Sequence, residues 1–200
     1  MATTKKEERK QEILTQAMKI FSRSGVKNTT MEEIAEAAGI GKGTIYEYFR
    51  SKEDIFAEAF RSYMEHLDES IAKRLYRVYD PIEKVKAVLS GFVEMMKDTS
   101  IDFVSIMVEF WAEGVQSKQR SPAFDLKKAY EDNRMMLASI LEEGMAAGSI
   151  RPLNASVTAS LLLGSIDGLM LQWFIDPSVF DLNALTDDLI DSFVQMLKPA

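Results

Sequence analysis

The stretch that decides the fold runs from Thr29 to Lys52 and reads TTMEEIAEAAGIGKGTIYEYFRSK. Thr30 and Glu33 have the spacing of a capping box, in which each side chain binds the backbone amide of the other residue, so a helix is predicted to begin there. Apolar residues then recur at three- and four-residue steps, which gives that helix one inward face. Gly39 is expected to end it, because glycine readily adopts the left-handed conformation of a helix exit.

A second helix is predicted from Lys42 to Phe49, after a turn that contains Gly39 and Gly41. Ile45 and Phe49 lie one turn apart and are expected to hold this helix against the first. Two helices joined by a glycine-containing turn describe a helix-turn-helix, whose second helix can enter the major groove of DNA. The simpler alternative is an ordinary corner between two helices of an all-helical protein.

The outward residues of the second predicted helix and its exit suit a DNA surface. They comprise two cations, three hydroxyls and a glycine that removes bulk where a backbone must approach a phosphate: Lys42, Lys52, Thr44, Tyr46, Tyr48 and Gly43. Cations and hydroxyls of this kind make most contacts to the DNA backbone. These side chains are therefore the candidate DNA-binding residues.

Together with the preceding ILTQAMKIFSRSGV, the stretch TTMEEIAEAAGIGKGTIYEYFRSKEDIF resembles the DNA-binding domain of the TetR (tetracycline repressor-like) family of bacterial transcription regulators. The resemblance covers roughly Glu8 to Phe60 without a gap and rests on A-x-x-x-G, K-G-T-x-Y-x-Y-F and K-E-x-x-F. It implies that the residues approaching DNA, mostly at phosphates, are Thr29, Thr30, Lys42, Gly43, Thr44, Tyr46, Tyr48 and Lys52.

Two positions depart from the usual pattern of that family. Gly41 stands where a serine or threonine often caps the recognition helix, and Glu47 places an acid where a neutral or basic residue is common. Glu47 could accept a hydrogen bond from a cytosine amine. It could equally point away from the phosphates.

The net charge of −7 is divided unevenly along the 200 residues. Residues 1–52 carry ten basic and seven acidic side chains, a net charge of +3, so the remainder carries −10. We call residues 1–50 the head and residues 51–200 the body. A basic head on an acidic body favours an orientation in which the head faces a polyanion such as DNA. Lys5, Lys6, Arg9 and Lys10 lie on the leading turns of the first helix or in a tail before it, where they could meet the DNA backbone or be solvated.

The periodicity predicts an all-α protein of about nine helices, with no signal for strands or repeats. The expected ranges are 5–24, 30–38, 42–49, 51–79, 81–97, 102–114, 123–147, 155–175 and 182–197. Residues 1–50 form a three-helix DNA-binding domain with the helix-turn-helix at about 30–49, and residues 51–200 form a larger effector-binding and dimerisation domain. The small head has a marginal core of its own. It should therefore lean on the first half of helix 51–79, whose tilt then moves the head.

Helix 155–175 carries apolar residues on more than one face, so it must be buried on more than one side. Gly164 and Gly168 lie four residues apart and allow another helix to come close. The sequence therefore predicts a homodimer through about residues 155–197, with two recognition helices roughly 34–36 Å apart for an inverted-repeat operator in double-stranded DNA. The alternative is that this helix is the central core helix of a monomer.

Methionines and aromatic side chains are frequent in the predicted body, and methionine adapts to irregular cavities. An apolar cavity with a few polar groups is what a small effector needs, and the family resemblance implies such a pocket. Its candidate residues are Tyr63, Met64, Phe92, Met96, Phe103, Met107, Phe110, Trp111, Tyr130, Arg134, Asp167, Met170 and Trp173. Most of these residues are individually compatible with an ordinary core.

The inventory argues against other classes of protein. The chain has no cysteine and one histidine, His66, and it shows no nucleophile elbow, phosphate loop or metal motif. The apolar run 161–175 contains Asp167 and two glycines, so it is expected to be too short and too polar for a membrane span. The charged start of the chain lacks the apolar core of an export signal. The prediction is a cytoplasmic repressor, without cofactor, metal or membrane partner, that a small hydrophobic effector releases from DNA. The alternatives are a helical protein-interaction module with a vestigial helix-turn-helix, and a helical enzyme.

Overall fold

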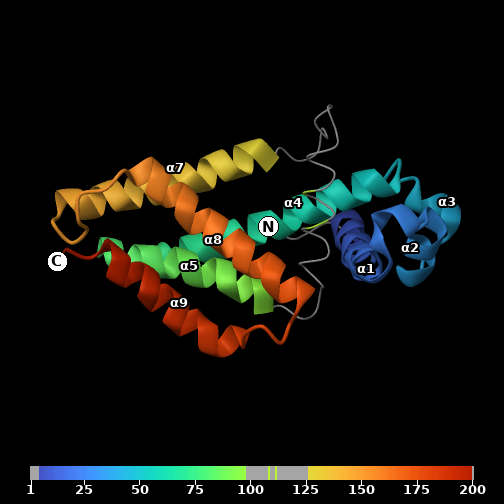
Figure 1. Cartoon of the computed structure of the whole chain (residues 1–200). Helices are drawn as coiled ribbons and strands as arrows, with labels where there is room; N and C mark the ends of the chain where they lie inside the picture. The colour runs from blue at the N-terminus through green and yellow to red at the C-terminus, as the bar shows by residue number, and fades with distance from the viewer. Residues whose placement is uncertain (1–4, 98–107, 109–110, 112–125, 200) are drawn as a thin grey trace. The chain divides into compact units, whose positions relative to one another are not determined.

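The computed structural model describes residues 5–97, 108, 111 and 126–199. Within these ranges the ordered elements are all helices, and no strand is found, so the all-α prediction is confirmed (Figure 1). The helix predicted at 102–114 lies outside the described residues, apart from two positions. The chain divides into two compact units, Met1–Glu65 with Asp98–Asp125 and His66–Lys97 with Leu126–Ala200.

The first unit begins with α1, Lys5–Asn28, whose regular winding is interrupted at Gly25. The φ of Gly25 is 75°, a left-handed value that glycine adopts without strain, and this agrees with the predicted end of the helix after Ser24. The inner stripe of α1 is buried, as predicted: Ile13, Leu14, Ala17, Met18 and Phe21.

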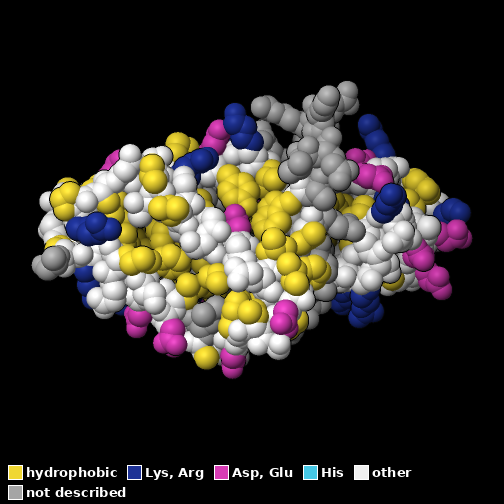
Figure 2. Space-filling model, viewed as in Figure 1, with side chains coloured by type: hydrophobic (Ala, Val, Ile, Leu, Met, Phe, Trp, Pro, Cys, Tyr) yellow, Lys and Arg dark blue, Asp and Glu magenta, His cyan; other side chains and the backbone are white. Residues whose placement is uncertain are grey.

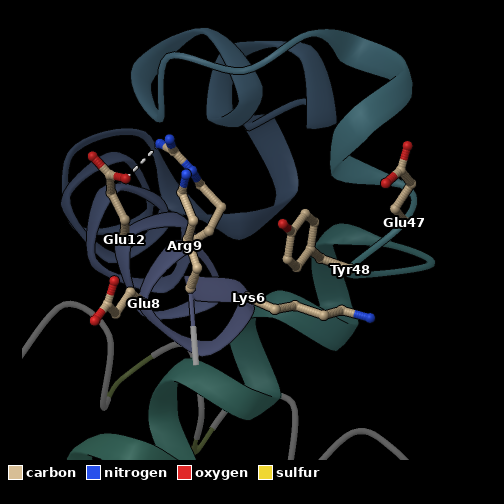
Figure 3. Close-up of a pocket in the computed structure, with 7 residues that line it drawn as sticks. Lys6, Glu8, Arg9, Glu12, Glu47 and Tyr48 are labelled. Atoms are coloured by element: carbon tan, nitrogen blue, oxygen red, sulfur yellow. Dashed lines mark hydrogen bonds and ion pairs between the residues drawn. The ribbon is translucent and has the colours of Figure 1, made fainter. Parts of the chain in front are cut away.

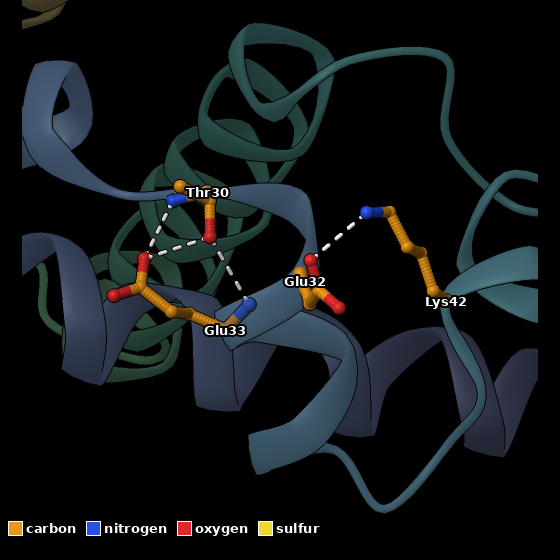
Figure 4. A network of polar contacts seen from close by, with 4 residues as sticks. All are labelled: Thr30, Glu32, Glu33 and Lys42. Atoms are coloured by element: carbon orange, nitrogen blue, oxygen red, sulfur yellow. Dashed lines mark hydrogen bonds and ion pairs between the residues drawn. The ribbon is translucent and has the colours of Figure 1, made fainter.

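Helix α2, Met31–Ala37, begins with the predicted capping box (Figure 4). The Thr30 amide donates to Glu33 Oε2 at 2.7 Å, and the Glu33 amide donates to Thr30 Oγ1 at 3.2 Å. These bonds satisfy two of the amides that a helix start leaves without partners. Gly39 follows with φ 66°, as expected for the exit.

Helix α3, Lys42–Ile45, is shorter than the predicted range of 42–49. Its cap is Gly41, which offers no side-chain hydrogen bond to the first turn. Beyond Ile45 the backbone tightens, because Glu47 N bonds Thr44 O at 3.1 Å and Tyr48 N bonds Ile45 O at 3.1 Å. Such three-residue bonds are usual where a helix winds into a turn.

Helix α4, Lys52–Leu75, is preceded by Ser51, whose hydroxyl accepts from Asp54 N at 3.2 Å and caps the first turn. Its first half completes the core of the first unit, since the Phe56 ring meets the Phe21 ring edge-on at 5.6 Å. The helix ends four residues before the predicted Tyr79, and Arg77 has a φ of 63°. The division between the two units falls within α4, so this one helix contributes to both.

The second unit adds α5, Pro81–Lys97; α7, Leu126–Ala146; α8, Ala155–Ile175; and α9, Leu182–Leu197. Helix α5 packs against α7, α8 and α9, and α7 packs along α8 (Figure 1). Predicted caps open two of these helices: Asp80 Oδ1 accepts from Glu83 N at 3.0 Å, and Asn154 Oδ1 accepts from Val157 N at 3.0 Å.

Helix α8 is buried along one side only in the single chain. Leu162, Ile166 and Met170 are buried, whereas Leu161 is 65% exposed and Ile175 is 74% exposed. Hydrophobic side chains gather on the surface of this part of the molecule (Figure 2). The 21-residue helix is long and apolar enough to cross a membrane by length and composition, a test that core helices of soluble proteins also pass. The apolar run 161–175 is thus part of a longer helix, so the length expected from that run was too short.

Candidate nucleic-acid interface

The two threonines before α2 use their side chains to hold the entry to the helix-turn-helix. Thr29 is 1% exposed, and its hydroxyl donates to Gly25 O at 2.8 Å. The Thr30 hydroxyl donates to Glu33 Oε2 at 2.9 Å while accepting from the Glu33 amide. Bonds from the Thr30 amide and hydroxyl lower the pKa of the Glu33 carboxyl. In the free protein, both hydroxyls are thus committed to local structure.

Lys42 stands at the start of α3 and pairs with Glu32 of α2 (Figure 4). Its ammonium donates to Glu32 Oε2 at 2.9 Å, and this bond and charge raise the pKa of Lys42. The two side chains are 61% and 66% exposed. An exposed pair of this kind contributes little to stability, so a phosphate can replace Glu32 at small cost.

Lys52 lies at the start of α4, and its side chain binds the connection between α1 and α2. Its ammonium donates to Lys27 O and to Thr29 O, each at 2.8 Å. An ammonium has three N–H donors. One donor therefore remains for a phosphate, while the other two fix the connection between α1 and α2.

Helix α3 and its exit present the remaining candidate residues. A Cβ added at Gly43 would meet no atom within 4 Å, so the backbone there is open. Tyr46 is 51% exposed. Thr44 and Tyr48 are half-buried. These four positions offer an open backbone and three hydroxyls beside Lys42.

A hollow of about 580 Å³ lies between the start of α1 and the exit of α3 (Figure 3). Sequence reasoning did not find it, because its two sides are about 40 positions apart in the chain. Its lining residues are Lys5, Lys6, Glu8, Arg9, Glu12, Glu47 and Tyr48. Arg9 binds Glu12 at 2.6 Å. The hollow therefore brings the predicted cationic helix start beside Tyr48.

Lys10 faces the interior of the first unit rather than this hollow. It forms an ion pair with Glu58 of α4, and its ammonium lies 5.6 Å from the centre of the Phe49 ring. Among the four N-terminal cations proposed to meet DNA, Lys10 is thus already engaged in packing.

The predicted effector residues are only partly within the described structure. Phe92 and Met170 are buried, and Met64, Trp111, Tyr130, Arg134, Asp167 and Trp173 are half-buried. Phe103, Met107 and Phe110 lie outside the described residues, as do the side chains of Tyr63 and Met96. The pocket therefore stays a prediction.

One polar contact joins two of these residues inside the second unit. The Tyr130 hydroxyl of α7 donates to Asp167 Oδ2 of α8 at 2.8 Å. Burial raises the pKa of the Asp167 carboxyl, and the bond from Tyr130 opposes that effect. Asp167 is thus a partly desolvated acid and the only charged residue of α8. No group of three or more potential metal ligands occurs among the described residues.

The fold and this surface define a helix-turn-helix DNA-binding protein with a helical C-terminal unit. Residues 13–59 match the family model of bacterial regulatory proteins of the tetR family. Residues 81–197, more than half of the chain, match the C-terminal domain of BetI-type transcriptional repressors. The chain belongs to the TetR family of bacterial transcriptional regulators, which confirms the resemblance seen in the sequence.

Relatives and solved structures agree with this assignment. The chain is 29% identical to the HTH-type transcriptional regulator AcrR of Shigella flexneri, over 95% of this chain and 89% of AcrR. It is 30% identical to the HTH-type transcriptional repressor KstR2 of Mycolicibacterium smegmatis, over 72% and 68% of the two chains. The structure of a transcriptional regulator from Saccharomonospora viridis, solved in complex with choline, superposes with a TM-score of 0.83 at 23% identity, covering 97% of this chain and 100% of that one.

Proposed function

We propose that this regulator is a homodimeric repressor that binds an inverted-repeat operator and is released by a small, hydrophobic effector. The observation that carries the proposal is the helix-turn-helix surface, where Lys42, Tyr46 and Gly43 stand open beside a hollow lined by Lys5 and Lys6. Cations and hydroxyls placed around an exposed recognition helix are what contacts to DNA phosphates need. The name of the KstR2 relative supports repression rather than activation.

The uncovered side of α8 supports the homodimer. Exposed large apolar residues lie along α8 and α9 and the turn between them: Val157, Leu161, Leu171, Phe174, Ile175, Val179 and Met196. A Cβ added at Gly164 or Gly168 would meet nothing within 4 Å, so a second helix could approach closely there. A core helix of a monomer would be covered on this side. A two-fold contact through residues 155–197 covers it and also supplies the second recognition helix.

The effector is proposed to bind in the second unit, near the half-buried Tyr130 and Asp167 and the buried Met170. The choline complex of the Saccharomonospora viridis protein shows that a protein of this fold can hold a small molecule. Because α4 contributes to both units, it is the proposed link between effector and DNA. An effector shifts the population of DNA-bound protein only by its differential affinity for the two states.

A cytoplasmic location follows from this function, since the operator is there. Within the described residues, α8 alone is long and apolar enough to span a membrane. The proposed dimer gives its exposed side chains a protein partner instead. Catalysis forms no part of the proposal.

The test is operator binding as a function of salt. DNA that flanks the gene of this protein is footprinted with the purified full chain, and the affinity is then measured between low and physiological salt. Binding through several phosphates should weaken steeply as salt rises. Lys42→Ala should lower the affinity for every sequence and reduce the salt slope by about one, with the dimer intact by sedimentation.

Two results contradict the proposal. A chain that binds no flanking DNA at low ionic strength is not such a repressor, and a protein-interaction module then becomes the better explanation. A chain that sediments as a monomer at micromolar concentration lacks the second recognition helix. Leu161→Glu is the matched variant, because it should convert the dimer to a folded monomer and lower operator affinity without touching the DNA-facing surface.

A further inference from the structure

The acid at the exit of α3 is the exposed residue of the helix-turn-helix surface that the proposed function leaves without a role. Glu47 is exposed and follows directly on Tyr46, which is 51% exposed. Its side chain lines the hollow of about 580 Å³ together with Lys6 and Tyr48. In Figure 3, Tyr48 lies between Glu47 and the Arg9–Glu12 pair. Glu47 thus stands on the same surface as the hydroxyls expected to meet DNA.

The charges around Glu47 leave its carboxylate available. The hollow is lined by three cations and three acids, and Arg9 is neutralised by Glu12 at 2.6 Å. Among the described residues, Glu47 forms no ion pair or side-chain hydrogen bond, whereas Lys42 is paired with Glu32. The backbone of Glu47 is fixed by its bond to Thr44 O at 3.1 Å. Its position is therefore set locally, and its oxygens are free.

A carboxylate can find few partners on DNA. It accepts hydrogen bonds and donates none, so phosphates repel it and only base amines attract it. In the major groove, guanine presents two acceptors, and thymine presents an acceptor and a methyl group. Adenine presents an amine beside the N7 acceptor, whereas cytosine presents its N4 amine without an acceptor on the same base. The complement to an isolated carboxylate is therefore cytosine.

We propose that Glu47 is a specificity-determining residue, which accepts a hydrogen bond from the N4 amine of one cytosine in each half of the operator. This inference rests on the proposed DNA-binding function and deepens it. Lys6, which lines the same hollow, offsets part of the repulsion between the acid and the neighbouring phosphates. The operator then has a C·G pair at the position that faces Glu47.

The test is selection from a random pool of double-stranded DNA by the full chain and by two variants, Glu47→Ala and Glu47→Gln. The wild type should enrich a palindrome with cytosine at one position of each half-site, and other bases there should bind about tenfold more weakly per half-site. Glu47→Ala should lose the preference at that position alone. Glu47→Gln should move it toward adenine, because an amide can bind adenine N6 and N7 together.

Glu8→Gln is the matched control, since Glu8 is an exposed acid on the opposite side of the same hollow. It removes the same charge, so it should strengthen binding to all sequences alike and keep the cytosine. If both Glu47 variants enrich the palindrome of the wild type, Glu47 does not read a base and the inference is overturned. If the wild type itself retains no DNA at low ionic strength, the DNA-binding function fails, and this inference fails with it.

Discussion

Replacing Lys52 with methionine should loosen the helix-turn-helix itself, as well as weaken DNA binding. The ammonium of Lys52 bonds Lys27 O and Thr29 O, each at 2.8 Å, and so ties α4 to the connection before α2. Methionine keeps an unbranched side chain that is one atom shorter, and it removes the ammonium that makes both bonds. Lys42→Met is the matched control, because the Lys42 ammonium bonds only the exposed Glu32 carboxylate at 2.9 Å among described residues.

The expected loss follows from the two bonds. A hydrogen bond to a charged group contributes about 1.5–3 kcal/mol when it is shielded from water. The bond to Lys27 O is exposed and the bond to Thr29 O is part-buried, so water will replace much of that contribution. We expect Lys52→Met to destabilise the local structure by about 1–2 kcal/mol, which corresponds to roughly a 5- to 30-fold change in the population of the opened state.

Amide hydrogen exchange measures this opening peptide by peptide. In Lys52→Met, the amides of α2 and α3 should exchange roughly 5- to 30-fold faster than in the wild type, while those of α8 should not change. In Lys42→Met, exchange should stay near that of the wild type, although both variants should bind DNA more weakly. Equal exchange in all three proteins would refute the positioning role of Lys52 and leave it as a phosphate contact only.

Four further predictions concern the start of α2, close packing and a buried acid. Thr30→Ala should destabilise α2 by about 1 kcal/mol through loss of the cap, measured by urea unfolding. The pKa of Glu33 is lowered in the folded protein. The ionised carboxylate therefore stabilises the fold above its ordinary pKa near 4.5, and this stabilisation is lost as pH falls below that value. Glu33→Gln should accordingly make the free energy of unfolding depend less on pH in the acid range. Gly144→Ala should cost about 1–3 kcal/mol, because the added Cβ would lie 2.4 Å from Ile150 Cδ1. Gly164→Ala is the control: its site is open, so the change should stabilise a monomeric variant by about 0.5–1 kcal/mol through helix propensity alone. The folded-state pKa of Asp167 is raised by burial, so the native protein binds more protons there and stability falls as pH rises above about 3.8. Asp167→Asn should remove that part of the pH dependence of the free energy of unfolding. If the variant and the wild type show the same pH dependence, burial of the Asp167 carboxyl is not its cause.

The sequence predicted best those features that depend on neighbours in the chain. The capping box of Thr30 and Glu33, the left-handed Gly39 and the Asn154 cap are all present, because each is decided within about four residues. Helix α3 was predicted too long, since its apolar spacing continues to Phe49, whereas the backbone after Ile45 tightens into three-residue bonds from Glu47 N to Thr44 O and from Tyr48 N to Ile45 O. The spacing of apolar residues does not show where the backbone leaves the α-helical hydrogen-bond pattern.

Contacts between distant parts of the chain could not be predicted. The pattern of charges marks Lys42, Lys52 and Lys10 equally as cations, yet one binds a carboxylate on α2, one binds two carbonyls and one packs on Phe49. The buried Thr29 hydroxyl is a similar case. Which of these residues contact DNA is still a prediction, as are the domain boundary near residue 50 and the effector pocket.

The exposed apolar side of α8 makes the stability of the protein depend on its concentration in the cell. On the proposed dimer, each newly made subunit leaves Leu161 and Ile175 in water until it meets another. Monomeric subunits are then the ones removed by proteolysis and aggregation, and the monomeric fraction grows as the protein concentration falls. The melting temperature should accordingly climb with protein concentration, and the supply of active regulator should fall faster than in proportion to its synthesis.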